Sequence, residues 1–153
     1  MSDFSNQYNA TIDDKGRVVL PAAYKREMGE DFERMMSVEI DPYEKCLNLY
    51  PASSWEKRIA FIKSRLNPND PRQSRLLDKF YQNFVKINLA ENGRLNIPNA
   101  FMQRINAAKD VVFTGQGDRI RLWDSEEYRK SMMPDEDYPG LFEEFLGGGL
   151  NSF

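Results

Sequence analysis

A short unit occurs twice in the sequence, and this repeat constrains the fold more than any other feature. The unit spans residues 13–24 and returns in altered form at 91–101, each time with a turn, a short strand, a proline and a short helix. Four pairs of residues are identical at an offset of 77 positions: Gly16/Gly93, Arg17/Arg94, Pro21/Pro98 and Ala23/Ala100. A supersecondary unit used twice indicates a chain built from two similar halves.

Further strands and helices are expected around each copy in the same order. The first half predicts strands at 8–13, 18–20, 35–41 and 46–50, and a helix from Pro21 to Met28 that Gly29 ends. The second half predicts strands at 85–89, 94–97, 111–114 and 119–123, and a helix from Pro98 to about 107. Asn92-Gly93 is a strong hairpin signal, because both residues tolerate the positive φ of a tight turn.

Two amphipathic helices are expected between the halves. Ser53 with Glu56 has the pattern of a capping box, and Trp55 begins an apolar stripe at helical spacing. The second helix is expected at 72–86 and carries an aromatic stripe. Such stripes are more often core or subunit contacts than ligand sites.

These elements predict an α+β protein that is mainly β. Each half has only a few short strands, too few for a stable sheet with open edges. We therefore expect two βαβ-hairpin repeats intertwined into one small β-barrel with flanking helices. The expected parts are a first repeat at 7–53, a helical connector at 54–80, a second repeat at 81–126, and a short helix with an acidic tail at 127–153.

The C-terminal segment differs in charge from the rest of the chain. Residues 124–153 carry eight acidic and two basic side chains, a net charge of −6, whereas residues 1–123 sum to +3. Asp124 with Glu127 predicts a helix start, and the segment after Pro134, rich in acids and glycines, is expected to be mobile. The total of −3 neither supports nor excludes a nucleic-acid partner.

The residue types argue against catalysis. Histidine is absent, which removes the commonest general base and metal ligand. Cys46 is the single cysteine, allows no intramolecular disulfide, and lies in an apolar run typical of a core residue. Gly147-Gly148-Gly149 lacks the lysine of a phosphate loop. We expect no catalytic or metal-binding residue, no cofactor and no small-molecule ligand.

The sequence also predicts where the protein works. No apolar run approaches the roughly 20 residues that a membrane-spanning helix needs, and the N-terminus lacks the basic and apolar segments of a secretion signal. The single cysteine points to a reducing compartment. We expect a cytoplasmic protein with no membrane partner.

The repeated turn is the candidate functional site. In one interpretation Gly16 and Gly93 only make the turns, and the arginines are merely solvated. Arg17 and Arg94, however, recur with their glycines while neighbouring positions drift, and an arginine has no backbone role in a hairpin. Beside a rigid turn, the five-donor guanidinium suits phosphate oxygens or guanine O6 and N7. Two such turns, related by a pseudo-two-fold axis, would reach a DNA groove at a fixed separation.

Residues 12–21 and the later Gly-Arg-x-x-Ile-Pro copy resemble the MraZ proteins, a branch of the AbrB-like regulators of the SpoVT-AbrB superfamily. Cys-Leu-x-Leu-Tyr-Pro at 46–51, Trp55 and Leu122-Trp123 are also similar, and the resemblance covers residues 7–130. It implies a swapped-hairpin β-barrel, a ring-shaped homo-oligomer and a DNA-binding transcriptional regulator of bacteria. It further implies repression of the division and cell-wall gene cluster at tandem promoter repeats, and association with the nucleoid.

In the first copy the family's turn pattern is complete. Asp13 and Arg17 have the expected spacing of aspartate and arginine, with Lys15 between them. The resemblance implies that Lys15, Gly16 and Arg17 contact double-stranded DNA. It also implies that Asp13 holds the arginine or the turn in place.

The second copy departs from this pattern. Ala90 stands where the aspartate is expected, and Asn92 replaces the lysine. Gly93 and Arg94 remain candidate DNA contacts, but no carboxylate stands at the position that would pair with this arginine. We therefore expect the first turn to dominate DNA contact and the second to be weaker or mainly structural.

Two interpretations from other functional classes stay open beside the DNA-binding regulator. A scaffold protein would set its turns against protein and dock partners on its aromatic helices, which the acidic total charge slightly favours. An enzyme is the third, since small interlocked β-barrels host catalysis elsewhere. No carboxylate pair survives the repetition, however, and this weighs against an enzyme.

Overall fold

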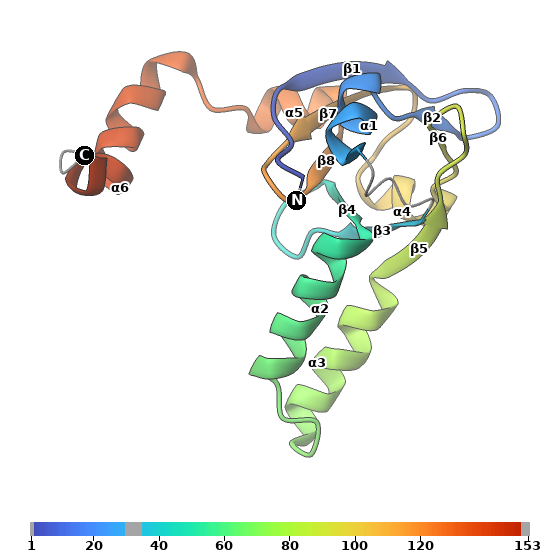
Figure 1. Cartoon of the computed structure of the whole chain (residues 1–153), viewed down its shortest axis with the longest axis vertical. Helices are drawn as coiled ribbons and strands as arrows, with labels where there is room; N and C mark the ends of the chain where they lie inside the picture. Colours follow the sequence, from blue (N-terminus) through green and yellow to red (C-terminus); the bar gives the residue numbers. More distant parts are fainter. Residues whose placement is uncertain (1, 30–34, 151–153) are drawn as a thin grey trace.

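Strands from both halves and six α-helices make up the described part of the chain, residues 2–29 and 35–150 of a computed structural model (Figure 1). The first half contains β1 (Gln7–Thr11), β2 (Val18–Val19), α1 (Ala22–Met28), β3 (Met35–Ile40) and β4 (Leu47–Pro51). The connecting helices are α2 (Ala52–Arg65) and α3 (Pro71–Gln82). The second half contains β5 (Phe84–Asn88), β6 (Arg94–Leu95), α4 (Asn99–Arg104), β7 (Asp110–Gly115) and β8 (Ile120–Asp124). The chain continues with α5 (Ser125–Ser131), the 3₁₀ turn η2 (Asp135–Asp137) and α6 (Tyr138–Leu150).

A six-stranded antiparallel sheet interleaves the two halves. Its order is β1-β7-β8-β4-β3-β5, so β1 of the first half pairs with β7 of the second, and β5 of the second pairs with β3 of the first. A separate two-stranded sheet, β2-β6, joins the halves again, with Val18 opposite Leu95 and Val19 opposite Arg94. The intertwining expected from the sequence is therefore present, because each half completes the hydrogen bonding of the other.

The described strands do not close into a barrel. β1 and β5 are the edges of the larger sheet, and no ladder joins them. β2 and β6 lie between these edges but are only two residues long, and a single bridge from Leu89 to Leu95 links the end of β5 to β6. Pro21 and Pro98 follow shortly after and have no N–H to extend a ladder. The closed swapped-hairpin barrel expected from the sequence is thus not confirmed.

The two connecting helices form a hairpin that extends from the sheets (Figure 1). Trp55 of α2 stacks on Phe80 of α3 with ring centroids 6.0 Å apart, and it contacts Phe84 of β5 at 4.6 Å. The helix predicted at 72–86 is too long, since α3 ends at Gln82 and Phe84 begins a strand. Phe80 in the helix and Phe84 in the strand both pack on the indole ring of Trp55, so the aromatic pattern extends past the end of α3.

Helix starts were predicted with mixed success. The capping box at Ser53 is wrong, because α2 begins at Ala52 after Pro51 and has no side-chain cap. The start at Asp124 is confirmed, since its Oδ2 accepts hydrogen bonds from the backbone N–H groups of Glu126 and Glu127 at 3.1 and 3.2 Å.

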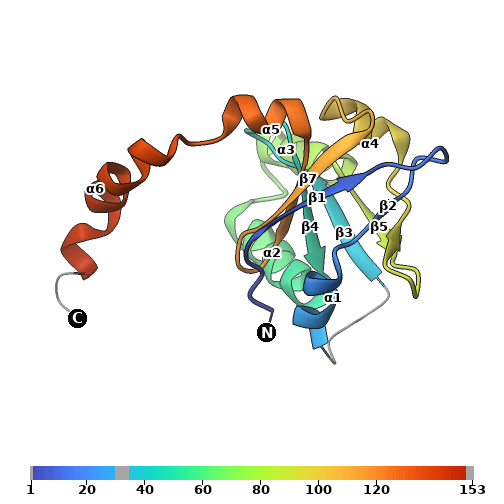
Figure 2. The same ribbon diagram turned by 90° about the horizontal axis from the view of Figure 1, so that it is seen from above.

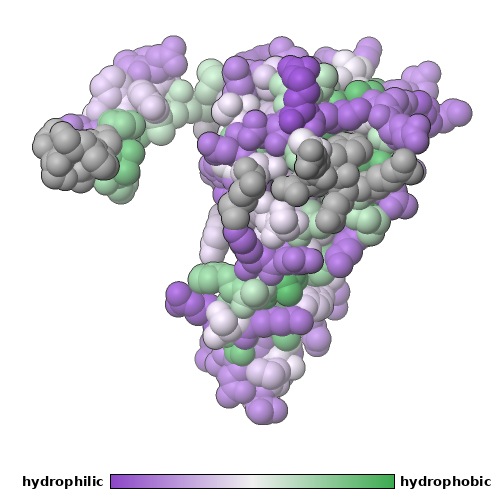
Figure 3. Space-filling view, viewed as in Figure 1, coloured by the Kyte–Doolittle hydropathy of each residue, from purple (hydrophilic) through white to green (hydrophobic). Residues whose placement is uncertain are grey.

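The C-terminal segment stands away from the body as an arm. Both ribbon views show α6 beyond α5 and apart from the sheets (Figures 1 and 2). Apolar surface is visible on this arm in the space-filling view (Figure 3). The sequence predicted only an acidic, mobile tail, whereas residues 135–150 form η2 and α6. Mobility stays a prediction, and residues 151–153 lie outside the described chain. Within residues 2–29 and 35–150, no helix is long and apolar enough to cross a membrane.

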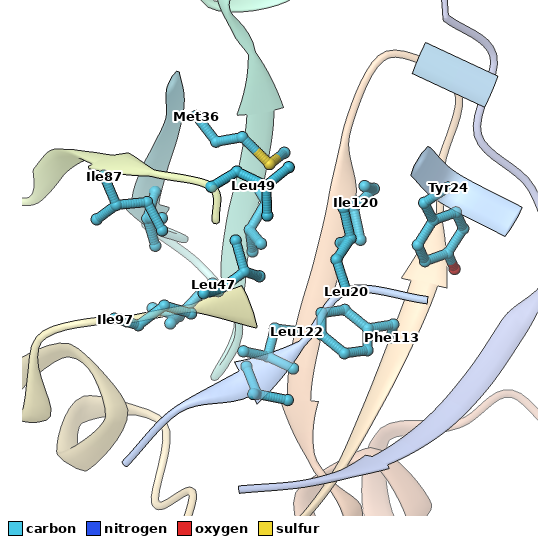
Figure 4. Packing of buried hydrophobic residues seen from close by; sticks show 14 of the residues in the cluster. Leu20, Tyr24, Met36, Leu47, Leu49, Ile87, Ile97, Phe113, Ile120 and Leu122 are labelled. Carbon is cyan, nitrogen blue, oxygen red and sulfur yellow. The ribbon is translucent and has the colours of Figure 1, made fainter. Parts of the chain in front are cut away.

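One hydrophobic core is shared by the two halves. The buried residues labelled in Figure 4 come from both: Leu20, Tyr24, Met36, Leu47, Leu49, Ile87, Ile97, Phe113, Ile120 and Leu122. Leu20 and Ile97, which match between the two copies of the repeat, are both buried. Cys46 is fully buried as well, as expected of a core residue. The shared core joins the two halves that carry the repeated turns.

Candidate nucleic-acid interface

The turn between β1 and β2 is closed by backbone bonds and by one carboxylate. Asp13 N donates to Arg17 O at 2.8 Å, and Gly16 N donates to Asp13 O at 3.0 Å. Asp13 Oδ1 accepts from the backbone N–H groups of Lys15 and Arg17 at 2.9 and 2.8 Å. Gly16 has a φ of +80°, a conformation that favours glycine. Asp13 thus fixes the backbone of this turn.

The same carboxylate holds the arginine side chain. Asp13 Oδ2 accepts from Arg17 Nε at 3.0 Å, although the side chains stay 42% and 28% exposed. These hydrogen bonds, led by the backbone N–H of Arg17, lower the pKa of Asp13 and keep it ionised at neutral pH. Within the described residues, the terminal guanidinium nitrogens of Arg17 make no hydrogen bond, so their donors remain available to a ligand.

The first turn projects into solvent. Its loop extends from the body beyond β1 in both ribbon views (Figures 1 and 2). Lys15 is exposed, and a Cβ built on Gly16 would meet no atom within 4 Å. Asp14 is exposed too and offsets part of the positive charge. We call residues 13–17 the tip; it carries two cations and two carboxylates, one of them engaged with Arg17.

A hollow of about 470 Å³ lies beside the tip. Asp13, Lys15 and Gly16 line it from the first half, and Asn96 and Asn99 line it from the second. Neither asparagine was predicted as a site residue, and the side-chain amide of each both donates and accepts hydrogen bonds. Their position beside the tip depends on the β2-β6 register, which brings residue 96 next to Arg17 and which the sequence alone does not give.

The turn between β5 and β6 repeats the backbone of the first without its carboxylate. Ala90 N donates to Arg94 O at 3.1 Å, and Gly93 N donates to Ala90 O at 2.8 Å. Gly93 has a φ of +83°. Asn92 Oδ1 accepts from the backbone N–H of Arg94 at 3.0 Å and so replaces one of the bonds that an aspartate would make. The Arg94 side chain forms no ion pair within the described part of the chain.

The second turn is packed against the first half. Leu20 N donates to Gly93 O at 2.8 Å, and Lys25 Nζ of α1 donates to Glu91 O at 2.9 Å. Gly93 is buried, and a Cβ there would lie 3.1 Å from Lys25 Cδ and 3.4 Å from Leu20 O. The antiparallel β2-β6 ladder places the two turns at its opposite ends. The structure therefore keeps Gly93 and Arg94 apart from the tip.

A buried polar cluster lies elsewhere, among the β3–β4 hairpin, α2 and β8. Arg58 Nη2 donates to Glu39 Oε2 at 2.6 Å, and Arg121 Nη2 donates to Asp41 Oδ2 at 3.3 Å and to Cys46 Sγ at 3.0 Å. Burial raises the pKa of the Cys46 thiol to about 12, so it is protonated and not nucleophilic at neutral pH. Within the described chain no cluster of His, Cys, Asp and Glu could hold a metal. The cluster joins the two halves and offers no reactive group.

Known proteins resemble the chain along nearly its whole length. A family model described as MraZ protein matches residues 4–79 and 80–137. The chain belongs to the MraZ family. It is 30% identical to the transcriptional regulator MraZ of Phocaeicola vulgatus over 97% of this chain and 96% of the relative. The regulators of the same name from Cytophaga hutchinsonii and Stenotrophomonas maltophilia are 31% and 32% identical, over 95% and 96% of this chain and 96% of each relative.

Membership of the MraZ family confirms the resemblance found in the sequence. The family is one of DNA-binding transcriptional regulators, so the chain is such a regulator and not an enzyme. Each of the two matched segments contains one copy of the repeated turn, residues 13–17 in the first and 90–94 in the second.

Proposed function

We propose that this chain binds double-stranded DNA in a sequence-specific manner through its tip. Lys15 and Arg17 contribute cationic donors, Gly16 lets the backbone approach the DNA closely, and Asp13 holds the guanidinium in place. An arginine held through one nitrogen keeps its other donors for phosphate oxygens or guanine edges. The observation that carries the proposal is the 3.0 Å Asp13–Arg17 pair on an open turn, because it orders a charged side chain beside a glycine that faces open space.

The second turn has a lesser role in this proposal. Gly93 and Arg94 retain the backbone geometry of the tip. The second turn, however, accepts hydrogen bonds from Leu20 and from Lys25 of α1, so it stabilises the packing of the first half. Arg94 is partly exposed and contributes at most an auxiliary DNA contact.

Several copies of the tip must act together for specific binding. A specific protein–DNA interface buries about 1,000–2,500 Å² of protein surface, far more than one hairpin tip offers. We propose that copies assemble into a ring-shaped homo-oligomer that presents identical tips at fixed spacing. Tandem promoter repeats then bind several tips at once, and the effective concentration of each further tip raises the overall affinity.

The family resemblance supports a biological setting for this activity. In it the protein is cytoplasmic, associates with the nucleoid and represses the division and cell-wall gene cluster by excluding polymerase from the promoter. Chromatin immunoprecipitation with sequencing tests this setting, with enrichment expected at the promoter of its own gene cluster. Reads spread evenly over the chromosome would contradict it.

A gel-shift experiment tests the role of the tip. The probe is a fragment from upstream of the protein's own gene, and Arg17→Ala is expected to abolish its retardation without changing the oligomer size in gel filtration. Arg72→Ala is the matched control, because Arg72 is an exposed arginine at the start of α3. Normal binding by Arg17→Ala would reject the proposal.

A further inference from the structure

The α6 arm carries an apolar stripe that the rest of the described chain leaves open. Its members fall at the i, i+3, i+4, i+7 and i+8 spacing of one helix face: Tyr138, Leu141, Phe142, Phe145 and Leu146. Phe145 is 77% exposed and Tyr138 is 59% exposed. Two aromatic rings this open, on a helix that stands off the body, mark a surface made for contact with another molecule (Figure 3).

Acidic side chains flank the stripe. Glu143 and Glu144 are exposed on α6, and the segment 124–153 as a whole has a net charge of −6. The surface that receives this helix should therefore combine an apolar floor with positive charge.

A groove of that chemistry lies on the α2–α3 hairpin. It has a volume of about 540 Å³, and its lining includes Trp55, Ile59, Ala60, Lys63, Phe84 and Lys86. Aromatic and aliphatic side chains form most of its wall, and its two lysines outnumber its one glutamate. Tyr81 is 41% exposed, so part of the aromatic surface is open to solvent.

We propose that α6 of one copy docks into the α2–α3 groove of a neighbouring copy. The proposal rests on the homo-oligomer of the proposed function and assigns a contact to it. An amphipathic helix that lays its apolar face in such a groove is a common mode of recognition. The stripe would fill the groove while Glu143 and Glu144 approach Lys63 and Lys86, an apolar centre with a complementary charged rim.

The arrangement within one chain favours a second copy as the source of the helix. Both ribbon views show α6 apart from its own α2 and α3, with the body of the sheet nearer to the hairpin than the arm is (Figures 1 and 2). Arm and groove are also two different surfaces, so each copy can give its arm to one neighbour and receive the arm of another. Head-to-tail contacts of this kind repeat from copy to copy and close into a ring when the rotation permits.

Disulfide trapping between two variants, each with one cysteine added to the native Cys46, tests the contact. Full-length Phe145→Cys and Ala60→Cys, one of them carrying a mass tag, are mixed and oxidised. The expected result is a cross-linked product that contains one tagged and one untagged chain. Native Cys46 is buried and gives little background. Phe145→Cys mixed with Asn9→Cys, an exposed site on β1 outside the groove, is the matched control and should give far less product.

A second variant measures the contribution of the stripe to assembly. Phe145→Glu adds charge at an exposed position, so the fold should survive, and light scattering coupled to gel filtration should show the mass falling to smaller species. Tyr43→Glu is the control, because Tyr43 is an aromatic side chain that is 94% exposed outside the arm. Its oligomer mass should not change.

The possible results separate this inference from the proposed function. Absence of the mixed disulfide, together with an unchanged mass for Phe145→Glu, would overturn the docking. So would a disulfide that forms within single chains carrying both Phe145→Cys and Ala60→Cys but not between chains. DNA retardation by the wild-type protein without arm docking would remove only this inference, whereas docking without retardation would remove only the proposed function.

Discussion

The two turns of the repeat have the same backbone and opposite surroundings. Each is closed by the same pair of backbone hydrogen bonds around a glycine at positive φ. Gly16 faces open space and its arginine is held by Asp13, whereas Gly93 is buried and no carboxylate of the described residues holds Arg94. A duplicated motif thus preserves its geometry while its environment decides its use. The first turn is exposed for a partner, and the second holds the molecule together.

The largest expected difference between the two turns is the effect of removing their arginines on DNA affinity. Arg17→Ala should lower affinity for the promoter fragment by about 10–100-fold for each engaged tip, since a bidentate base contact is worth about 1–3 kcal/mol. Several tips bound at once multiply the loss. Arg94→Ala should change affinity little, as measured by fluorescence anisotropy on the same fragment. Equal losses for the two variants would give both turns the same role.

The next effect concerns the carboxylate of Asp13, which Ala90 replaces in the second turn. Asp13→Ala removes two backbone hydrogen bonds and the ion pair to Arg17, so the turn backbone and the guanidinium both lose the group that holds them. DNA affinity should fall, but less than in Arg17→Ala, because the cation remains. Ala90→Asp is the reciprocal change and should place a carboxylate within reach of Arg94. If Ala90→Asp in an Arg17→Ala background restores no DNA binding, the packing of the second turn rather than its missing carboxylate keeps it from DNA.

The sequence predicted the local parts of this comparison and missed the distant ones. Turn, strand, proline and helix were predicted in both copies because each depends on nearby residues, such as Gly16 at positive φ and Pro21 without an N–H. The burial of Gly93 was not predicted, because its packing partner Lys25 lies far away in the chain. The same reason hid Asn96 and Asn99 beside the tip.

In the arm, by contrast, the local residues led to a wrong prediction of its secondary structure. Glycine and proline weaken a helix, and the segment contains Pro139, Gly140 and Gly147 among its acids. These residues suggested a tail without structure, yet the stripe from Tyr138 to Leu146 has full helical spacing. The prediction of a mobile tail followed the glycine, proline and acid content of the segment and overlooked the helical spacing of its apolar residues.

A smaller effect concerns the stability that each glycine provides. Gly16→Ala and Gly93→Ala both force a side chain into the left-handed region, at about 1–2 kcal/mol each. Gly93→Ala should cost more, because its Cβ would also press on Lys25 and Leu20, while Gly16→Ala meets open space. Thermal unfolding should show the difference as a few degrees in Tm, given about 2–4 °C per kcal/mol for a domain of this size. Equal Tm values would mean that the Lys25 side chain moves aside without loss of stability.

The smallest effect comes from the acidic residues next to the two turns. Asp14 and Glu91 occupy matching positions, but only Asp14 lies on the tip that faces DNA in the proposal. Removing its charge should strengthen binding by roughly 0.5 kcal/mol per tip, the Coulomb energy of two charges about 8 Å apart in water. The gain should shrink as salt rises, because screening acts over about 10 Å at 0.1 M. Asp14→Asn should therefore bind DNA more tightly at low salt and Glu91→Gln should not. A gain for both variants would show that binding responds only to net charge and not to the position of the tip.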